Sequence, residues 1–562
     1  MLKKFTATFY FKTVVIFNMV FSPVSGQNTI GLISNTAGNE DGYVLFSPNG
    51  SDTTYLIDKC GYKVHQWSSN RQPGQSVYLL EDGTLLRTGR SNNNQFNAGG
   101  QGGFIDRYDW NSQLLWSYQI SNTTECQHHD IRYLPNGNIL AIVWELKTPA
   151  EALAAGRDSS KIGSALWSEK IIELQPSGTS SAMIVWEWHV WDHLVQEFDN
   201  NKPNYGIVSQ HPELINLNFI SGAPTNADWL HFNALDYNEA LDQIVISNHN
   251  FSEIWIIDHS TTTTEAASHS GGVYGKGGDL LYRWGNPQAY NRGTATTKKF
   301  YGQHNPRWIP TGFADAGNLL VFNNGLGRPG SFSSVEIIQP PIDSAGNYTI
   351  NGSLAYGPDS AYWKYTDPVP SNFYSLNISG AQRLSSGNTI ICSGNRGIFF
   401  EIDSLKNIVW KYINPTTTGG AVLSQGAASV QNSVFRAELY PLNYPGLTGH
   451  LLTPGNPVEL NPTPSNCDML TGILNGGLQQ DERIQPVNPI TGSVIVNCTI
   501  SLSAATITLN DLSGRCVFRK ENVFLDYGNN FIETESSLPQ GIYLLQVNSG
   551  SLHWNFKVVV SE

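Results

Sequence analysis

The chain of 562 residues is poor in charge, in cysteine and in long apolar runs. Only 14% of its residues are charged, and its net charge of -13 comes without any basic cluster. This argues against a nucleic-acid partner, because phosphate binding needs a footprint of Lys and Arg. The six cysteines show no CxxC or zinc-finger spacing, and nothing indicates a catalytic thiol. No segment after the N-terminus could span a bilayer.

The N-terminus has the features of an export signal. Lys3 and Lys4 give it a positive start, residues 14–21 are apolar, and residues 23–26 are small enough for cleavage, although Lys12 interrupts the apolar part. We therefore expect a signal peptide over 1–26. The alternative, a membrane anchor, needs a longer stretch, of ~20 apolar residues. An exported chain can carry one or two disulfides, and the pair considered is Cys467 with Cys498.

Turn and strand formers dominate the composition, with 53 Gly, 28 Pro and 15 Trp. Two landmarks recur along residues 42–440. One is a turn that follows an apolar run and ends at Gly50, Gly83, Gly137, Gly312 or Gly387. The other is a tryptophan that closes a later strand: Trp67, Trp116, Trp186, Trp284, Trp363 and Trp410. Between them, apolar and polar residues alternate as in half-buried strands.

Six tryptophans predict six four-stranded blades of roughly 65 residues each, as in a β-propeller. A β-sandwich array or a solenoid is the alternative. The expected fold class is all-β, a six-bladed β-propeller followed by a small antiparallel β-sandwich. The expected domains are the signal peptide (1–26), the propeller (27–450), a linker (451–485) and the sandwich (486–562).

Three histidines occupy the same place in three repeats. His129 and His304 lie eight residues before a turn glycine, and His231 lies seven before Asn238 at the matching turn. If the first strand of each blade lines the central channel, six equivalent positions face one another. They are Gly42, Gln75, His129, His231, His304 and Ser379. Imidazoles gathered in this way suit chemistry near neutral pH.

Four interpretations of this ring remain open. A histidine could be a nucleophile, with the others holding the transferred group or serving as acid and base. Three histidines could bind zinc or another divalent ion. The ring could be a binding pocket without chemistry. The histidines could also simply line the channel and hydrogen-bond one another and water.

Other polar residues are weaker candidates. His249 ends a strand and could reach the channel, and three arginines after strand ends could face an anionic group or pair within a blade: Arg328, Arg396 and Arg436. His189 and His193 are expected to pack or to line a loop. We expect His211, His259 and His269 on the surface.

Several motifs, in order, resemble the bacterial arylsulfate sulfotransferases over about residues 40–450. They are Asp228-Trp-Leu-His231-Phe-Asn, Gly302-Gln-His304-Asn-Pro, Gly317-Asn-Leu-Leu-Val-Phe-Asn-Asn-Gly325 and Phe435-Arg-Ala437. The resemblance implies a propeller enzyme that moves a sulfuryl group from a phenolic sulfate ester to a phenol. It implies a sulfohistidine intermediate, no nucleotide sulfate donor and no cofactor. His231 and His304 match active-centre histidines of that family.

The chain departs from the family pattern at two places. The stretch Ser393–Gly397 has no histidine where the family carries its sulfated one, and Ser331–Ser334 replaces an arginine. We therefore assign His129 as the nucleophile, His231 and His304 to sulfuryl binding and acid–base work, and Arg396 or Arg328 to charge stabilisation. The expected substrate-binding residues are Gln75, His128, Asn233, His249, Asn305 and Ser379.

The alternatives to this enzyme are a secreted ligand-binding propeller without turnover and a metal-dependent hydrolase with three histidines. The expected small-molecule partners are phenols.

The C-terminal segment resembles the sorting domain of the type IX secretion route. The matching residues are Pro486-Val-Asn-Pro489, Leu512-Ser-Gly514, Leu538-Pro-Gln-Gly-Ile-Tyr543 and Lys557-Val-Val-Val560. The resemblance implies contact with the secretion machinery and a place outside the cell or on the outer-membrane surface.

Overall fold

The computed structural model describes residues 28–463, 467, 483–487, 490, 493–511, 515–534, 538–550 and 552–560. The expected signal peptide lies outside the described residues, as does much of the expected linker. None of the helices in the described part is long and apolar enough to cross a membrane.

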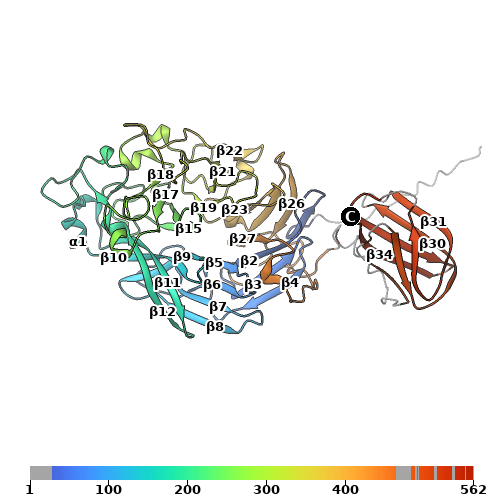
Figure 1. The fold of residues 1–562 in the computed structure, drawn as a ribbon. Coiled ribbons are helices and arrows are strands. Elements are labelled where there is room, and N and C mark those ends of the chain that lie inside the picture. Colours follow the sequence, from blue (N-terminus) through green and yellow to red (C-terminus); the bar gives the residue numbers. More distant parts are fainter. Residues whose placement is uncertain are drawn as a thin grey trace, which may run out of the picture.

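Four-stranded antiparallel sheets account for most of the chain up to residue 440 (Figure 1). Four sets of strands run in chain order from the innermost strand to the outermost, and one parallel bridge joins the first two sets into a continuous sheet. The first two contain β5 (Pro73–Leu79), β6 (Leu85–Arg90), β7 (Gly103–Tyr108) and β8 (Leu114–Gln119), then β9 (Glu125–Tyr133), β10 (Ile139–Lys147), β11 (Leu166–Ser177) and β12 (Ser181–His189). The next two contain β15 (Phe232–Asn238), β16 (Gln243–Asn248), β17 (Glu253–Asp258) and β18 (Tyr282–Trp284), then β19 (His304–Trp308), β20 (Leu319–Asn323), β21 (Ser334–Ile338) and β22 (Trp363–Tyr365).

The two remaining sheets combine the ends of this region. One joins β27 (Val434–Tyr440) to β2 (Tyr43–Pro48), β3 (Thr53–Asp58) and β4 (Lys63–Ser68). The other adds β1 (Gly31–Asn35) outside β23 (Gly380–Arg383), β24 (Thr389–Ser393), β25 (Ile398–Ile402) and β26 (Ile408–Ile413). The innermost strand of the first sheet is therefore β27 and not β2. The expectation that Gly42 faces the channel was wrong, because it directly precedes a second strand.

These sheets are the blades of a six-bladed β-propeller, as predicted. Every landmark tryptophan lies in the fourth strand of its sheet, from Trp67 in β4 to Trp410 in β26. The innermost strands contact one another across sheets, for example β15 with β9 and β19, and β27 with β5 and β23. Figure 1 shows these strands grouped around the middle of the ring of sheets. Residues at the starts of these strands are thereby brought together.

Insertions between strands contain the helical turns. Two short α-helices, α1 (Pro149–Ala154) and α2 (Thr263–Ala266), each begin with a capping box in which a threonine and a glutamate satisfy the first backbone groups. The parallel pair β13 (Leu194–Val195) and β14 (Ile215–Asn216) lies in the insertion after β12. The 3-10 turns are Ser159–Lys161, Val190–Asp192, Val208–Gln210, Pro287–Tyr290, Ala295–Thr297, Pro370–Asn372, Gly394–Arg396 and Pro445–Leu447.

The C-terminal part forms two antiparallel sheets with a hydrophobic core of their own, drawn in red in Figure 1. One contains β28 (Ile484–Pro486), β29 (Ser493–Cys498) and β32 (Gly528–Glu533). The other contains β30 (Leu502–Asp511), β31 (Cys516–Leu525), β33 (Gly541–Ser549) and β34 (Leu552–Val560). This is the expected small β-sandwich.

One disulfide is formed, between Cys60 and Cys467. The pairing of Cys467 with Cys498 was therefore wrong, because Cys498 is a free, buried thiol in the core of the sandwich.

Candidate active site

Five histidine rings lie in a continuous row: four come from the inner strands or the residue before one, and His249 comes from the turn after β16. The ring centroids of His128 and His129 are 5.2 Å apart, and His129 is 4.7 Å from His231. His249 follows at 5.2 Å from His231, and His304 at 5.5 Å from His249. The structure thus brings the three predicted axial histidines into one group and adds two neighbours.

The backbone at these strand starts is left-handed. His129 has a φ of 50° and His231 a φ of 57°, and Gln75 and Ser379 also have positive φ. In the fifth blade the left-handed residue is Asn305, one position after His304. Positive φ is uncommon for residues other than glycine and is concentrated at functional sites.

A hydrogen-bonded chain of three buried side chains ends at His129. The Glu169 carboxyl group lies 2.7 Å from Nε2 of His128, and Nδ1 of His128 lies 2.9 Å from Nδ1 of His129. Nε2 of His129 has no hydrogen-bond partner among the described residues. Burial raises the pKa of Glu169 well above its ordinary value and lowers the pKa of both imidazoles well below theirs.

His231 carries its own carboxylate. Its Nδ1 lies 2.5 Å from Oδ2 of Asp228. Burial alone would lower the pKa of His231, but the charge and hydrogen bond of Asp228 outweigh burial and raise it. His231 is therefore the member of the row that most readily carries a positive charge.

His304 and His249 differ in what their nitrogens can do. Nδ1 of His304 donates to Asn324 at 2.8 Å, and its Nε2 accepts the Ile378 N–H at 3.1 Å. With both nitrogens engaged, His304 has no free ligand for a metal, which argues against the three-histidine metal site. His249 uses only Nδ1, toward Asn250 at 2.9 Å, and burial lowers its pKa to about 4.

A cavity of about 470 Å³ opens beside the row, with His249 and Asp228 in its wall. Two cationic side chains also line it, Lys298 and Arg157. The Lys298 ammonium lies 5.0 Å from the Tyr301 ring and has no hydrogen bond or ion pair within the described ranges. Burial lowers the pKa of Lys298 and that of Arg157, the latter to about 10. An anion that entered this cavity would meet these two cations, neither of which has an ion pair among the described residues, as well as the Asp228 carboxylate.

The other predicted binding residues are mostly tied to neighbouring blades. Asn233 Nδ2 donates to the Gln303 carbonyl, and Asn305 Oδ1 accepts the Ala381 N–H. Ser379 bonds Ser375 and accepts the Gly394 N–H through the same hydroxyl.

Gln75 pairs with His129 through a parallel bridge, and its buried Oε1 accepts no hydrogen bond from the described residues. Gln75 thus keeps an atom that could bind a ligand, as does Asn233, whose buried Oδ1 also has no hydrogen-bond partner among the described residues.

The predicted arginines do not reach the row by any described contact. Arg396 is exposed and donates to the Asn372 carbonyl. Arg328 donates to Ser334 and lies 3.6 Å from Glu336, so it pairs within its own blade. Both side chains therefore contact protein groups outside the histidine row.

Arg436, the third arginine that was expected to face an anion, lies in β27, the innermost strand of its sheet. It is buried, and it donates to Asp130 at 2.5 Å and to the Tyr78 hydroxyl at 2.8 Å.

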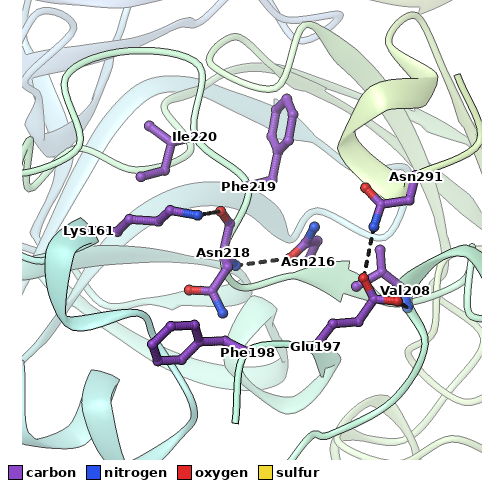
Figure 2. A pocket seen from close by; sticks show the side chains of 9 residues that line it. All are labelled: Lys161, Glu197, Phe198, Val208, Asn216, Asn218, Phe219, Ile220 and Asn291. Carbon is purple, nitrogen blue, oxygen red and sulfur yellow. Dashed lines mark hydrogen bonds between the residues drawn. The ribbon is translucent and has the colours of Figure 1, made fainter. Parts of the chain in front are cut away.

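Two further cavities lack histidines. One of about 410 Å³ lies in the insertion around β13 and β14, where Lys161 donates to the Asn218 carbonyl and Asn291 donates to Glu197 (Figure 2).

The other, of about 870 Å³, is lined by the far ends of the inner strands, and it contains the ion pairs Arg132–Asp236 and Arg307–Glu438. Because the charged groups of both cavities are largely paired, the candidate active site is the cavity beside the histidines.

Sequence reasoning missed Glu169, Lys298 and Arg157. Glu169 gave no clear signal, because it stands between Ser168 and Lys170 and reads as part of an ordinary half-exposed strand. Lys298 gave no signal either, since it stands in a polar stretch that resembles an ordinary surface loop.

Family models match two parts of the chain. One, described as "Arylsulfotransferase (ASST)", matches residues 26–436, and the other, "Secretion system C-terminal sorting domain", matches residues 486–561. No curated protein matches the chain significantly.

Solved structures resemble the chain only distantly. A protein of unknown function from Bacteroides caccae is 11% identical, with 71% of this chain and 98% of that chain covered and a TM-score of 0.37. Virginiamycin B lyase from Staphylococcus aureus is 10% identical, with 73% and 98% covered and a TM-score of 0.31. Hydrazine synthase from Kuenenia stuttgartiensis is 15% identical, with 54% and 68% covered and a TM-score of 0.31. Likenesses this weak carry no argument about function.

Proposed function

Because the chain belongs to the arylsulfotransferase family, we propose that it transfers a sulfuryl group between phenols through a sulfated histidine, His129. Its sorting domain marks it for export by type IX secretion to the cell surface or beyond. The proposed mechanism depends on one observation. The hydrogen bonds from Glu169 through His128 can hold the His129 ring in the tautomer whose Nε2 lone pair is free.

The first step breaks the donor ester. The Nε2 lone pair of His129 attacks sulfur, the bond from sulfur to the aryl oxygen breaks, and the His231 imidazolium gives its proton to the leaving oxygen. A phenol leaves, and the sulfuryl group remains on His129. Positive charge that develops on the His129 ring is stabilised through His128 by Glu169, as a carboxylate stabilises the imidazolium of a catalytic triad.

The second step reverses the first with a new phenol. Neutral His231 now takes the proton of the incoming hydroxyl, the phenol oxygen attacks sulfur, and the bond from sulfur to Nε2 of His129 breaks. His231 returns to the imidazolium that Asp228 stabilises. No nucleotide donor enters either step.

Cationic side chains bind the sulfuryl oxygens in this proposal. Lys298 and Arg157 both face the cavity that His249 lines, and a buried charge acts strongly where water is excluded. They take the role of charge stabilisation that was expected of Arg396 and Arg328. We assign His304 a positioning role, because its two nitrogens hold Asn324 and the Ile378 backbone.

The test uses the secreted protein with a chromogenic aryl sulfate, with and without a phenol acceptor. We expect phenol release to depend on the acceptor, and the peptide that contains His129 to carry one sulfuryl group when the acceptor is omitted. His129→Asn should lower turnover by at least about 10²–10⁴-fold, the range for loss of a positioned catalytic group. Release that continues in this variant, or a sulfuryl group on another histidine, would refute the assignment.

His211→Asn is the matched control. His211 is half-buried, contacts Glu213 at 3.0 Å and does not belong to the row, so its loss should leave turnover unchanged. Absence of any release by the native protein, with all phenols tried, would favour a binding protein without turnover.

A further inference from the structure

A buried histidine meets a loop of the next blade outside the candidate active site. His193 follows the turn Val190–Asp192, is fully buried and stacks on Trp188 with ring centroids 5.7 Å apart. The facing loop runs from α2 to Asp279. A Cβ at Gly278 would lie 2.5 Å from Nε2 of His193, so only glycine lets the loop approach this closely.

The two nitrogens of His193 both face acceptors. Nε2 lies 2.8 Å from the Ala266 carbonyl oxygen, which can only accept, so Nε2 carries a hydrogen. Nδ1 lies 2.8 Å from Oδ1 of Asp279, another acceptor when the carboxyl is ionised. The contact between Nδ1 and Oδ1 is therefore repulsive unless a proton or a metal ion lies between them.

A third ligand atom converges on the same oxygen. Nδ1 of His269 lies 2.7 Å from Oδ1 of Asp279, and the ligand atoms of the three residues lie within 4.8 Å of one another. His193 also shows the outer-shell bond typical of metal-bound histidine, in which the second ring nitrogen donates to a carbonyl.

We propose that His193, His269 and Asp279 bind a divalent transition metal. Two imidazoles and one carboxylate form a donor set that suits zinc, and a water molecule would complete a tetrahedron. The side chain of His269 is 61% exposed, so the ion can enter from solvent. Ligands of tetrahedral zinc lie about 3.3 Å apart, so each imidazole nitrogen would move about 0.5 Å farther from Oδ1 of Asp279 on binding.

The ion would join two parts of the chain that the sequence keeps far apart. His193 belongs to the insertion that follows β12, whereas His269 and Asp279 belong to the insertion between β17 and β18. None of the three lines the cavity beside the histidine row. The site would thus be a structural metal site that holds the insertion between β17 and β18 in place, separate from the proposed sulfuryl transfer.

The test is metal analysis of the full secreted protein, prepared without a histidine tag and dialysed against zinc and then buffer. We expect one zinc per chain, a rise in the thermal midpoint on adding zinc to chelator-treated protein, and tetrahedral visible absorption with cobalt. Asp279→Asn and His269→Ala should both reduce the bound zinc to background. Their affinity loss should exceed the ~10–100-fold caused by removing an outer-shell partner.

His211→Ala is the control, because its ring faces one carboxylate and no further ligand. It should keep the full zinc content. Native protein that binds no zinc above buffer, or variants that bind as much as the native chain, would overturn the proposal. The native titration gives a result even if a variant fails to fold.

Discussion

Two proton arrangements satisfy the chain that ends at His129. In one, the ionised Glu169 accepts from His128, which accepts from His129, and Nε2 of His129 is a free lone pair. In the other, protonated Glu169 donates to His128, which donates to His129, and Nε2 carries hydrogen. Burial favours the second at low pH, because it raises the pKa of Glu169. Loss of one proton from the chain therefore creates the nucleophile.

The pH dependence of donor cleavage follows from this. In the native protein, the single-turnover rate should rise with pH as the hydrogen-bonded chain of Glu169, His128 and His129 loses its proton. Because the pKa of Glu169 is raised, this rise should lie above the pH range in which a glutamate ordinarily titrates. Glu169→Gln should lower the maximal rate by about 10²–10⁴-fold and abolish this rise, because the variant has no carboxyl to protonate. Stopped-flow release of the phenol measures both. An unchanged rise in the variant would assign it to another group.

Lys298 brings a positive charge to the wall of the cavity, whereas the next residue, Lys299, does not line the cavity. Lys298→Met should lower kcat/KM for the aryl sulfate by about 10²–10³-fold, the scale for one donor to a developing anion. Lys299 donates to the Thr297 carbonyl instead and does not line the cavity, so Lys299→Met is the matched control. Steady-state kinetics decide the matter, and equal effects of the two substitutions would rule out a specific role for Lys298.

At the scale of elements, loops from one blade shape the site of the next. The loop between β6 and β7 places Gly100 against the third blade, where the His129 N–H donates to its carbonyl at 2.8 Å. The position of the proposed nucleophile therefore depends on a loop of the preceding sheet.

Gly100→Ala should displace the His129 ring, because the new Cβ would lie 1.8 Å from its Cε1. The φ of +81° at Gly100 adds backbone strain. We expect turnover to fall by at least about tenfold. Gly99→Ala is the control, since its Cβ would meet nothing within 4 Å. Activity and circular dichroism of both variants separate displacement from unfolding.

The third and fourth blades are also joined by charge. His259 contacts Glu173 of β11 at 2.9 Å and Asp242 at 2.7 Å, and its side chain is only 11% exposed. The expectation that it lies on the surface was wrong. Burial lowers its pKa, but the two hydrogen bonds outweigh burial and raise it to about 9.

A raised pKa in the folded state stabilises the protein at low pH. The contribution of His259 is complete below its ordinary value of 6.5 and is lost as pH rises to about 9. His259→Gln should therefore cost more stability at pH ~6 than at pH ~9.5, by about 2–3 kcal/mol. Urea unfolding at both pH values measures the difference, and an equal cost at the two would contradict the ion pairs.

At the scale of the whole molecule, the ring of sheets is closed from both ends of the chain. β27 arrives after five other sheets and supplies the inner strand of the sheet that contains β2. The disulfide Cys60–Cys467 spans 407 residues and fixes the chain beyond β27 to the same sheet.

Cys60→Ser should lower the free energy of unfolding by about 2–4 kcal/mol, the usual range for a disulfide, and should make stability insensitive to reductant. Cys516 is an exposed free thiol, so Cys516→Ser should change nothing. Thermal unfolding with and without reductant provides the comparison. A native midpoint that reductant leaves unmoved would argue against the bond.

The sequence alone determined the class of fold and the gathering of the axial histidines. Strand alternation, turn glycines and the closing tryptophans are local signals that each repeat carries by itself, so six blades could be counted. Equivalent positions in a ring have to converge, so the repeats by themselves predict that His129 lies beside His231.

Only the tertiary structure decided what those histidines can do. Hydrogen bonds to Glu169, Asp228 and Asn324 determine which ring nitrogens are engaged and which are free. Lys298 brings positive charge from a loop that does not belong to the repeat pattern. The same holds for His193 and Asp279, which lie 86 residues apart. Hydrogen-bond direction and burial depend on partners from other sheets, and those partners have no fixed spacing along the chain.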